Sequence, residues 1–226
     1  MTEQGAPARH PHPFAAVAHA GGLVLDVPEY QESFDRDHAL CSEPMWKLER
    51  AQHFFEPDVA SWRAMMDGDW ERSMALTERM AAPLTEHFRH RFPVRRVRVV
   101  EFPISAYLQW ELHVLATRAR VGSPCRVVRA ERVAALDPLP ELVIFSPSLM
   151  YEVLYDTYGG CVGGRRITDR AVVEPCLRTV RYLFEAGEDV LGFHEREIVP
   201  LPPPLVTDEM RAALPAYAHR TEEFRV

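Results

Sequence analysis

The residues best suited to chemistry in this chain are Tyr107 and Glu111, which stand four positions apart in a segment with helical periodicity. This spacing places both side chains on one face of a helix. Glu111 also borders an apolar stripe made by Leu108, Leu112 and Leu115. A carboxyl group at the edge of an apolar face has its charged form disfavoured unless it is paired.

Glu111 therefore admits two interpretations. As a functional group, it could transfer protons or anchor a cationic ligand. As a structural group, it would bind Arg98, Arg126 or Arg165 and fix the helix to a sheet. We favour the structural interpretation.

Metal binding and nucleophilic catalysis have weaker support. Among ten histidines, His87 and His90 are spaced as a helical pair, but no carboxylate or cysteine stands at ligand spacing from them. The pair of His38 and Cys41 is no stronger as a candidate metal site. The four cysteines are scattered, no G-x-S-x-G elbow occurs, and Cys161, beside hairpin glycines, is expected to be exposed. We expect no metal site, no catalytic residues and no cofactor.

The net charge of −7 argues against a surface that binds duplex nucleic acid. One arginine-rich run is the exception, and we interpret it as a helix end followed by an edge strand with outward arginines. The run contains Arg89, Arg91, Arg95, Arg96 and Arg98. A small DNA-associated regulator that uses these arginines is a third possibility. The absence of a signal peptide or a long apolar span predicts a cytoplasmic protein with no membrane contact.

The clearest element patterns lie between residues 93 and 190, and they predict an α/β (α+β mixed) fold with a mixed β-sheet and packed helices. We expect strands at 94–100, 125–128 and 142–145, a hairpin of 150–155 with 163–167, and helices at 105–121 and 170–186. Ser105 and Asp169 are expected to cap the two helices, and Gly122 and Gly187 to end them. The first two strands should be parallel neighbours joined through the first helix.

The rest of the chain divides by composition. We expect a flexible tail at 1–22, a mainly helical segment at 23–92 and a Pro-rich extension at 191–226 with a short helix near 207–213. In the helical segment, Asp69 should cap a helix that Pro83 kinks or divides. The segment is rich in aromatic residues, which should pack on the α/β core or on a second subunit of a homodimer. These residues are Trp46, Phe54, Phe55, Trp62 and Trp70.

The run VRRVRVVEFPISAYLQWELHVLATRARVGSPCRVV, followed by LPELVIFSP and LMYEVLYDTYGGCVGGRRITDRAVVEPC, resembles an uncharacterised actinobacterial domain family with the motif RVRVV-x-x-P-[LI]-S-x-Y-L-x-W-E-L. The resemblance covers about residues 93–187, with Ile104 where the family usually has leucine and a departure from the family at 123–125. It implies no agreed activity, and it implies genes near helix-turn-helix regulators. A weaker similarity in shape is to a non-catalytic phospholipase D-like half-domain. The catalytic H-x-K of that fold is absent, since the nearest match is His194-Glu195-Arg196.

These observations favour a non-enzymatic, regulatory domain that binds a small molecule or a partner protein. The ligand would lie between the 105–121 helix and the sheet, at Tyr107, Trp110, Glu111, Arg98 and Arg126. A helix-turn-helix regulator is a possible partner, and direct nucleic-acid binding is not expected. The alternative is an enzyme of specialised metabolism with an atypical acid/base site at Glu111 or His113.

Overall fold

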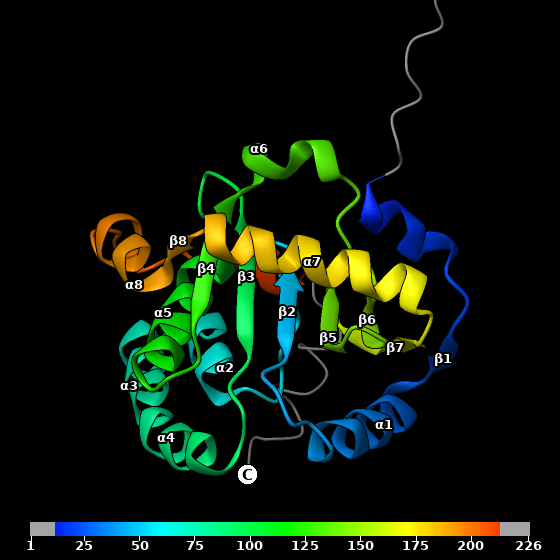
Figure 1. The fold of residues 1–226 in the computed structure, drawn as a ribbon. Coiled ribbons are helices and arrows are strands. Elements are labelled where there is room, and N and C mark those ends of the chain that lie inside the picture. The colour runs from blue at the N-terminus through cyan, green and yellow to red at the C-terminus, as the bar shows by residue number, and fades with distance from the viewer. Residues whose placement is uncertain (1–11, 213–226) are drawn as a thin grey trace, which may run out of the picture.

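The computed structural model describes residues 12–212 and contains one mixed sheet, with the strand order β1-β7-β6-β5-β2-β3-β4-β8 (Figure 1). The strands are β1 (Leu23–Leu25), β2 (Trp46–Glu49), β3 (Arg95–Val100), β4 (Cys125–Arg129), β5 (Leu142–Ser146), β6 (Leu149–Tyr155), β7 (Cys161–Ile167) and β8 (Glu188–Asp189). Strands β2, β3 and β4 run parallel, and the other neighbours pair antiparallel. The predicted mixed α/β fold is confirmed, as are the parallel pairing of β3 with β4 and the β6–β7 hairpin.

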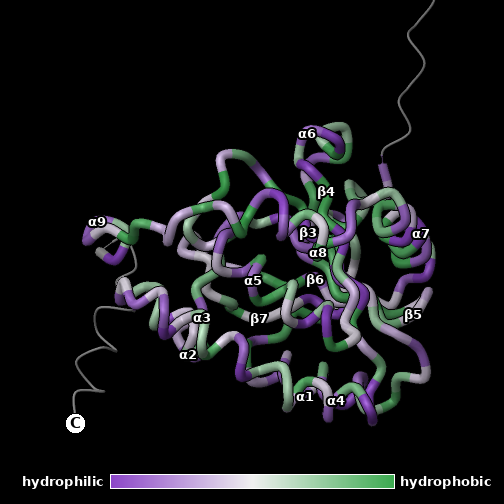
Figure 2. Tube along the Cα trace, turned by 90° about the vertical axis from the view of Figure 1, so that its left-hand side faces the viewer, coloured by the Kyte–Doolittle hydropathy of each residue, from purple (hydrophilic) through white to green (hydrophobic). Residues whose placement is uncertain are grey.

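Helices cover both faces of this sheet, so that α7 lies on one side and α5, α2 and α3 lie on the other (Figure 2). The α-helices are α1 (Val27–Ala39), α2 (Ala60–Met66), α3 (Trp70–Arg79), α4 (Ala81–His90), α5 (Ala106–Arg120), α6 (Ala130–Val133), α7 (Arg170–Ala186), α8 (Val190–Phe193) and α9 (Asp208–Ala212). Three further turns are η1 (Pro13–His19), η2 (Ala134–Leu136) and the π-helical η3 (His194–Ile198).

The two sheet faces differ in how they are buried. Beneath α7, side chains from β2, β3, β5 and β6 form one continuous apolar core with η1. On the opposite face, α5 and α8 cover β3 and β4, and α1 covers β5 and β6. The middle of this second face, at β2 and β3, carries charged side chains, which are described below.

Most of the predicted helix boundaries are confirmed by hydrogen bonds. Ser105 accepts from the backbone N–H of Leu108, and Asp169 accepts from that of Ala171. The prediction that Pro83 divides the helix after Asp69 is wrong. The break lies at Met80, and Pro83 stands in the first turn of α4, where a missing backbone N–H costs nothing.

The structure also corrects the description of the N-terminal residues. From residue 12 onward the predicted flexible tail is ordered, since Phe14 and Val17 of η1 are each 1% exposed in the core beneath α7. Residues 1–11 lie outside the described residues. The predicted helical segment 23–92 supplies β1 and β2 to the sheet, and β2 is an inner strand between β5 and β3.

The burial of Phe14 can be tested by truncation. Phe14→Ala should lower the free energy of unfolding by about 3 kcal/mol, because it empties a site in the core. Tyr182→Ala is the matched control, since Tyr182 on α7 is 70% exposed and its loss should cost about 0.5 kcal/mol or less. Urea denaturation measures both. Equally small decreases in the free energy of unfolding for both variants would support the prediction of a flexible tail instead.

Candidate functional site

A row of charged side chains lies on the sheet face that α5 covers. We call it the charged row, and it consists of Lys47, Glu49, Arg96, Arg98 and Glu111. Alternation along β2 and β3 puts Lys47, Glu49, Arg96 and Arg98 on one face, while Trp46, Leu48 and Val97 join the core beneath α7. Glu111 enters the row from α5 above it.

The centre of the row is the ion pair between Arg98 and Glu111. Arg98 Nε donates to Glu111 Oε2 at 2.7 Å, and the two residues are 0% and 5% exposed. Arg98 Nη1 also donates to the backbone carbonyl of Val99 at 3.1 Å. The structural role that we favoured for Glu111 is thus present, with Arg98 as its partner.

The pKa values of the side chains in the charged row depend on both their burial and their oppositely charged neighbours. Burial by itself lowers the pKa of Arg98, but the carboxylates of Glu111 and Glu49 raise it by more. Burial raises the pKa of Glu111, and the positive charge of Arg98 opposes that shift without cancelling it. For Glu49 the balance is reversed, because Arg96, Lys47 and Arg98 together outweigh burial and lower its pKa. The row holds three cations and two carboxylates, so its net charge is positive when all are ionised.

The arginine run of residues 89–98 does not form one outward face. The expectation of an edge strand is wrong, since β3 lies between β2 and β4. Arg96 and Arg98 point into the charged row, and Arg95 lies on the other face, over the ring of Trp46 at 5.1 Å. Buried arginines that already have carboxylate partners are not free to neutralise phosphates.

Next to the row, α5 packs against α2 and α3 through an aromatic and methionine-rich cluster. Tyr107 and Trp110 belong to it, with ring centroids 5.5 Å apart. Phe54 and Trp62 from the N-terminal third join them, as expected for packing on the α/β core. Trp46 lies apart, against Phe184 of α7 at 5.4 Å.

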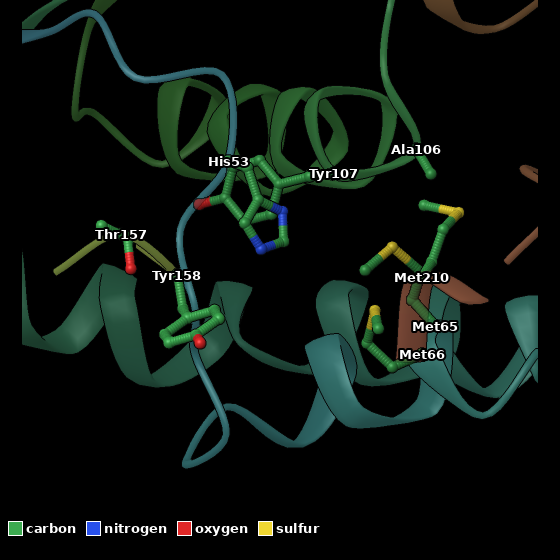
Figure 3. A pocket seen from close by; sticks show the side chains of 8 residues that line it. All are labelled: His53, Met65, Met66, Ala106, Tyr107, Thr157, Tyr158 and Met210. Atoms are coloured by element: carbon green, nitrogen blue, oxygen red, sulfur yellow. The ribbon is translucent and has the colours of Figure 1, made fainter. Parts of the chain in front are cut away.

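A pocket of about 300 Å³ opens at the edge of this cluster, and we call it the Tyr107 pocket (Figure 3). It is lined by His53, Met65, Met66, Ala106, Tyr107, Thr157, Tyr158 and Met210. The imidazole of His53 lies beside the Tyr107 ring, between Tyr158 on one side and the methionines on the other. The lining is mostly apolar, with a few polar groups, which is the composition typical of small-molecule sites.

Two polar atoms of the pocket residues are buried and have no hydrogen-bond partner among the described residues. These atoms are Tyr107 Oη and His53 Nε2. Tyr107 is 3% exposed, and burial, followed by the charge of Glu111, raises its pKa well above the usual value, so that its hydroxyl stays protonated. Burial lowers the pKa of His53, so its ring is neutral at pH 7 and can donate or accept. Buried polar groups without partners are uncommon in proteins, and these two can bind a ligand.

The walls of the pocket come from segments far apart in the chain and are held by backbone contacts. In the β6–β7 turn, Gly159 accepts a hydrogen bond from the N–H of Phe55 at 2.9 Å. A Cβ at Gly159 would lie 2.9 Å from the carbonyl oxygen of His53, and its φ of +82° favours glycine. On the other side, Arg211 donates to the carbonyl of Met66 at 2.7 Å and so fixes α9, which carries Met210.

The five predicted site residues do not lie together. Tyr107 lines the pocket, Trp110 packs in the same cluster, and Arg98 with Glu111 forms the ion pair behind them. Arg126 is separate, because it lies on the opposite face of the sheet, over the ring of Phe184 at 5.5 Å. Register explains this, since β4 sends Cys125 and Val127 toward α5 and therefore Arg126 toward α7.

His113, the alternative acid/base residue, is bonded to a second histidine. His194 Nε2 and His113 Nδ1 are 2.8 Å apart, so one ring donates and the other accepts. Burial lowers the pKa of His113 to about 4, and the neighbouring His194 adds to the shift. Burial also lowers the pKa of His194.

Glu56 is a titratable residue that sequence reasoning missed. It lies half-buried in the loop between β2 and α2. Burial raises its pKa to about 7, and the carboxylates of Glu111 and Glu49 add to this, while Lys47 opposes it. A lone glutamate in a polar loop carries no pattern that would have indicated this environment. Nor did any pattern single out His53, Tyr158 or Met210.

Within residues 12–212, no group of three or more His, Cys, Asp or Glu side chains is arranged to hold a metal ion. In α4, His90 is bonded to Glu86 at 3.2 Å, and His87 faces His38 of α1. None of the described helices combines the length and apolarity needed to cross a bilayer.

The profile of a family described as a domain of unknown function, DUF6879, matches residues 32–195. The chain belongs to this family. The DUF6879 range contains the charged row, the ion pair and most of the Tyr107 pocket, whereas η1, β1 and α9 lie outside it. Comparison with curated proteins gives no match, and comparison with solved structures gives none.

The ion pair of the DUF6879 domain can be tested by a double-mutant cycle. Glu111→Leu should lower the free energy of unfolding by about 3 to 5 kcal/mol, because it leaves Arg98 buried without a carboxylate. Arg98→Met/Glu111→Leu should be more stable than the sum of the single effects predicts, since both charges are then gone. The exposed pair Arg170 and Glu174 on α7 is the control and should show coupling near zero. Additive effects at Arg98 and Glu111 would contradict the pairing.

The histidine pair predicts a dependence of stability on pH. The unfolded chain takes up protons on these rings as the pH falls through about 6.5, whereas His113 in the folded protein does so only near pH 4. The free energy of unfolding should therefore decrease as the pH falls from about 6.5 to about 4, by about 1 to 2 kcal/mol, because solvent screens this partly exposed ring. Above that range the contribution of His113 is complete. His113→Gln should flatten the profile, and His90→Gln, on the exposed side of α4, should not. An unchanged profile in His113→Gln would show that the pair does not control it.

Proposed function

We propose that this chain is a non-enzymatic regulatory domain that binds a small molecule in the Tyr107 pocket. One observation carries the proposal: a mostly apolar pocket of about 300 Å³ whose lining includes Tyr107 and His53, each with a buried polar atom that has no partner among the described residues. Burial of an unpaired polar group costs free energy, and a ligand that binds these atoms recovers it. The charged row would brace the helix that carries Tyr107.

The lining indicates the kind of ligand. Three methionines adapt their shape and pack well on flat or irregular apolar bodies. Tyr158 offers an aromatic face at the rim, where it is 48% exposed. A protonated Tyr107 hydroxyl donates a hydrogen bond, so the ligand would carry an acceptor near His53 and Tyr107. We therefore expect a flat, largely apolar molecule with one carbonyl or ring nitrogen.

The positions of Glu111 and His113 support binding over catalysis. Each is bonded to another side chain, Glu111 to Arg98 and His113 to His194, and neither lines the Tyr107 pocket. A general acid or base needs hydrogen-bond reach of its substrate.

Several finer expectations stay predictions. They include the actinobacterial origin, a cytoplasmic location, a helix-turn-helix regulator as partner, homodimer formation and the likeness to a non-catalytic phospholipase D-like half-domain. The arginines paired within the charged row support the expectation that nucleic acid is not bound directly.

A thermal-shift screen of the full chain against a metabolite library tests the proposal. A hit should raise the melting temperature, and its affinity should fall about five- to ten-fold in Tyr107→Phe, which removes one hydrogen bond and little volume. Thr157→Trp should abolish binding by filling the pocket from its rim. Thr85→Trp, at an exposed position of α4, adds the same side chain elsewhere and should bind as the unmodified protein does.

Equal binding by Thr157→Trp and Thr85→Trp would place the ligand outside the Tyr107 pocket. Measurable turnover of a hit would refute the non-enzymatic claim.

The second candidate is an enzyme of specialised metabolism with acid/base chemistry at Glu111 or His113. Glu56 joins this candidate, because a pKa of about 7 suits proton transfer at neutral pH. Glu111→Gln and Glu56→Gln discriminate the two functions. A variant that stays folded and loses a product in vivo favours the enzyme, and a Glu111→Gln variant that unfolds shows that Glu111 is architectural.

A further inference from the structure

A second hollow is lined by residues of α1, α4 and α5, and it shares no residue with the Tyr107 pocket. Helices α1 and α4 lie at the same end of the molecule (Figure 2). We call it the Arg118 groove, and its volume is about 460 Å³. It is lined by His38, Met45, Met80, Pro83, Leu84, His87, Phe88, Phe92, Val94 and Arg118.

Apolar side chains form most of the groove. None of the α4 side chains is fully buried, so Leu84 and Phe88 stay half-exposed on the side that faces the groove. Phe92, in the link from α4 to β3, is 45% exposed. Apolar surface left open beside a helix is available to cover the apolar part of a ligand.

Positive charge gathers at the inner end. Arg118, near the C-terminus of α5, is half-buried, and its guanidinium has no hydrogen bond or ion pair with any residue from 12 to 212. Burial lowers the pKa of Arg118, and the nearby cation Arg96 adds to this, while the carboxylates of Glu49, Glu56 and Glu111 oppose the shift without cancelling it. His38 and His87 face each other across the groove, with ring centroids 6.5 Å apart.

The groove itself has no carboxylate in its lining. The charges that act on His38 from outside are Arg91 and Asp35, one of each sign. The charged row behind Arg118 already carries three cations against two carboxylates. Among the described residues, no carboxylate lines the groove or forms an ion pair with Arg118, so this guanidinium is available to pair with the carboxylate of a ligand.

We propose that the Arg118 groove binds an apolar monocarboxylate, a molecule of the medium-chain fatty acid class. The carboxylate accepts hydrogen bonds from the Arg118 guanidinium, which has a fork geometry that matches a carboxylate. The hydrocarbon part lies along Leu84, Phe88 and Phe92. A nucleotide or polyphosphate fits less well, because the groove offers one arginine and mostly apolar walls.

Calorimetric titration of the full chain with decanoate, decanol and decyltrimethylammonium tests this site. Decanoate should bind at least about ten-fold more tightly than decanol, and the cation should not bind. Arg118→Met should reduce decanoate affinity to that of decanol and leave decanol unchanged. Arg120→Met is the matched control, because Arg120 is an exposed arginine of the same helix that lies outside the groove.

Leu84→Glu provides a second variant, since it places a negative charge in the groove at a position that is not buried in the fold. It should abolish decanoate binding while the melting temperature stays close to that of the unmodified protein. Thr157→Trp, which fills the Tyr107 pocket, should bind decanoate normally.

Equal affinity for decanoate and decanol, or full decanoate binding by Arg118→Met, would overturn the proposal. Loss of binding in Thr157→Trp would assign the ligand to the Tyr107 pocket instead. A dimer that Leu84→Glu dissociates, without decanoate binding, would assign the groove to a second copy of the chain.

Discussion

The fold depends on the pairing of Arg98 with Glu111. An arginine on an inner strand cannot reach water, and a buried charge without a partner costs several kcal/mol. The burial of Arg98 therefore favours a position of α5 that brings Glu111 over β3. Once α5 lies there, its first turn presents Tyr107 to the loop after β2, and its last turn presents Arg118 to α4. One electrostatic requirement thus sets the orientation of the helix on which both hollows depend.

The same requirement explains why the sheet face is divided. On this face the sheet is apolar at β4, β5 and β6, whereas β2 and β3 carry charged side chains that pair with one another and with Glu111 of α5. Paired charges of this kind contribute little net stability. A shift in register would nevertheless lower the free energy of unfolding, because each carboxylate would lose its arginine. We interpret the charged row as the feature that fixes the position of α5, while the core beneath α7 supplies most of the hydrophobic stabilisation.

Local patterns in the sequence were sufficient to predict β3, α5, β4, the β6–β7 hairpin and α7. Each has a strong period and a clear boundary, such as Ser105 before α5. Strand β2 was missed because Lys47 and Glu49 resemble surface residues, and Glu49 is buried against Arg96 and Arg98, which are 47 and 49 positions away. The prediction of a flexible tail was wrong for a related reason. Pro13 and its neighbours indicate irregular structure, but Phe14 packs in the core beneath a helix that begins more than 150 residues later. The Tyr107 pocket is assembled from five segments, so no local pattern could have indicated His53, Tyr158 and Met210 together. Arg126 does not lie beneath α5, because side chains alternate along β4. Cys125 and Val127 point toward α5, so Arg126 points toward α7.

The most direct test of the ligand site is a methyl NMR titration of methionine-labelled protein with those hits from a metabolite library that carry no carboxylate, because monocarboxylates are expected in the Arg118 groove. The chain has eight methionines, and five of them line the two hollows, Met65, Met66 and Met210 in the Tyr107 pocket and Met45 and Met80 in the Arg118 groove. Our account predicts that such a ligand shifts the methyl signals of Met65, Met66 and Met210 and leaves those of Met45 and Met80 unchanged. Shifts confined to Met45 and Met80, or none at Met65 and Met66 for any bound compound, would contradict it.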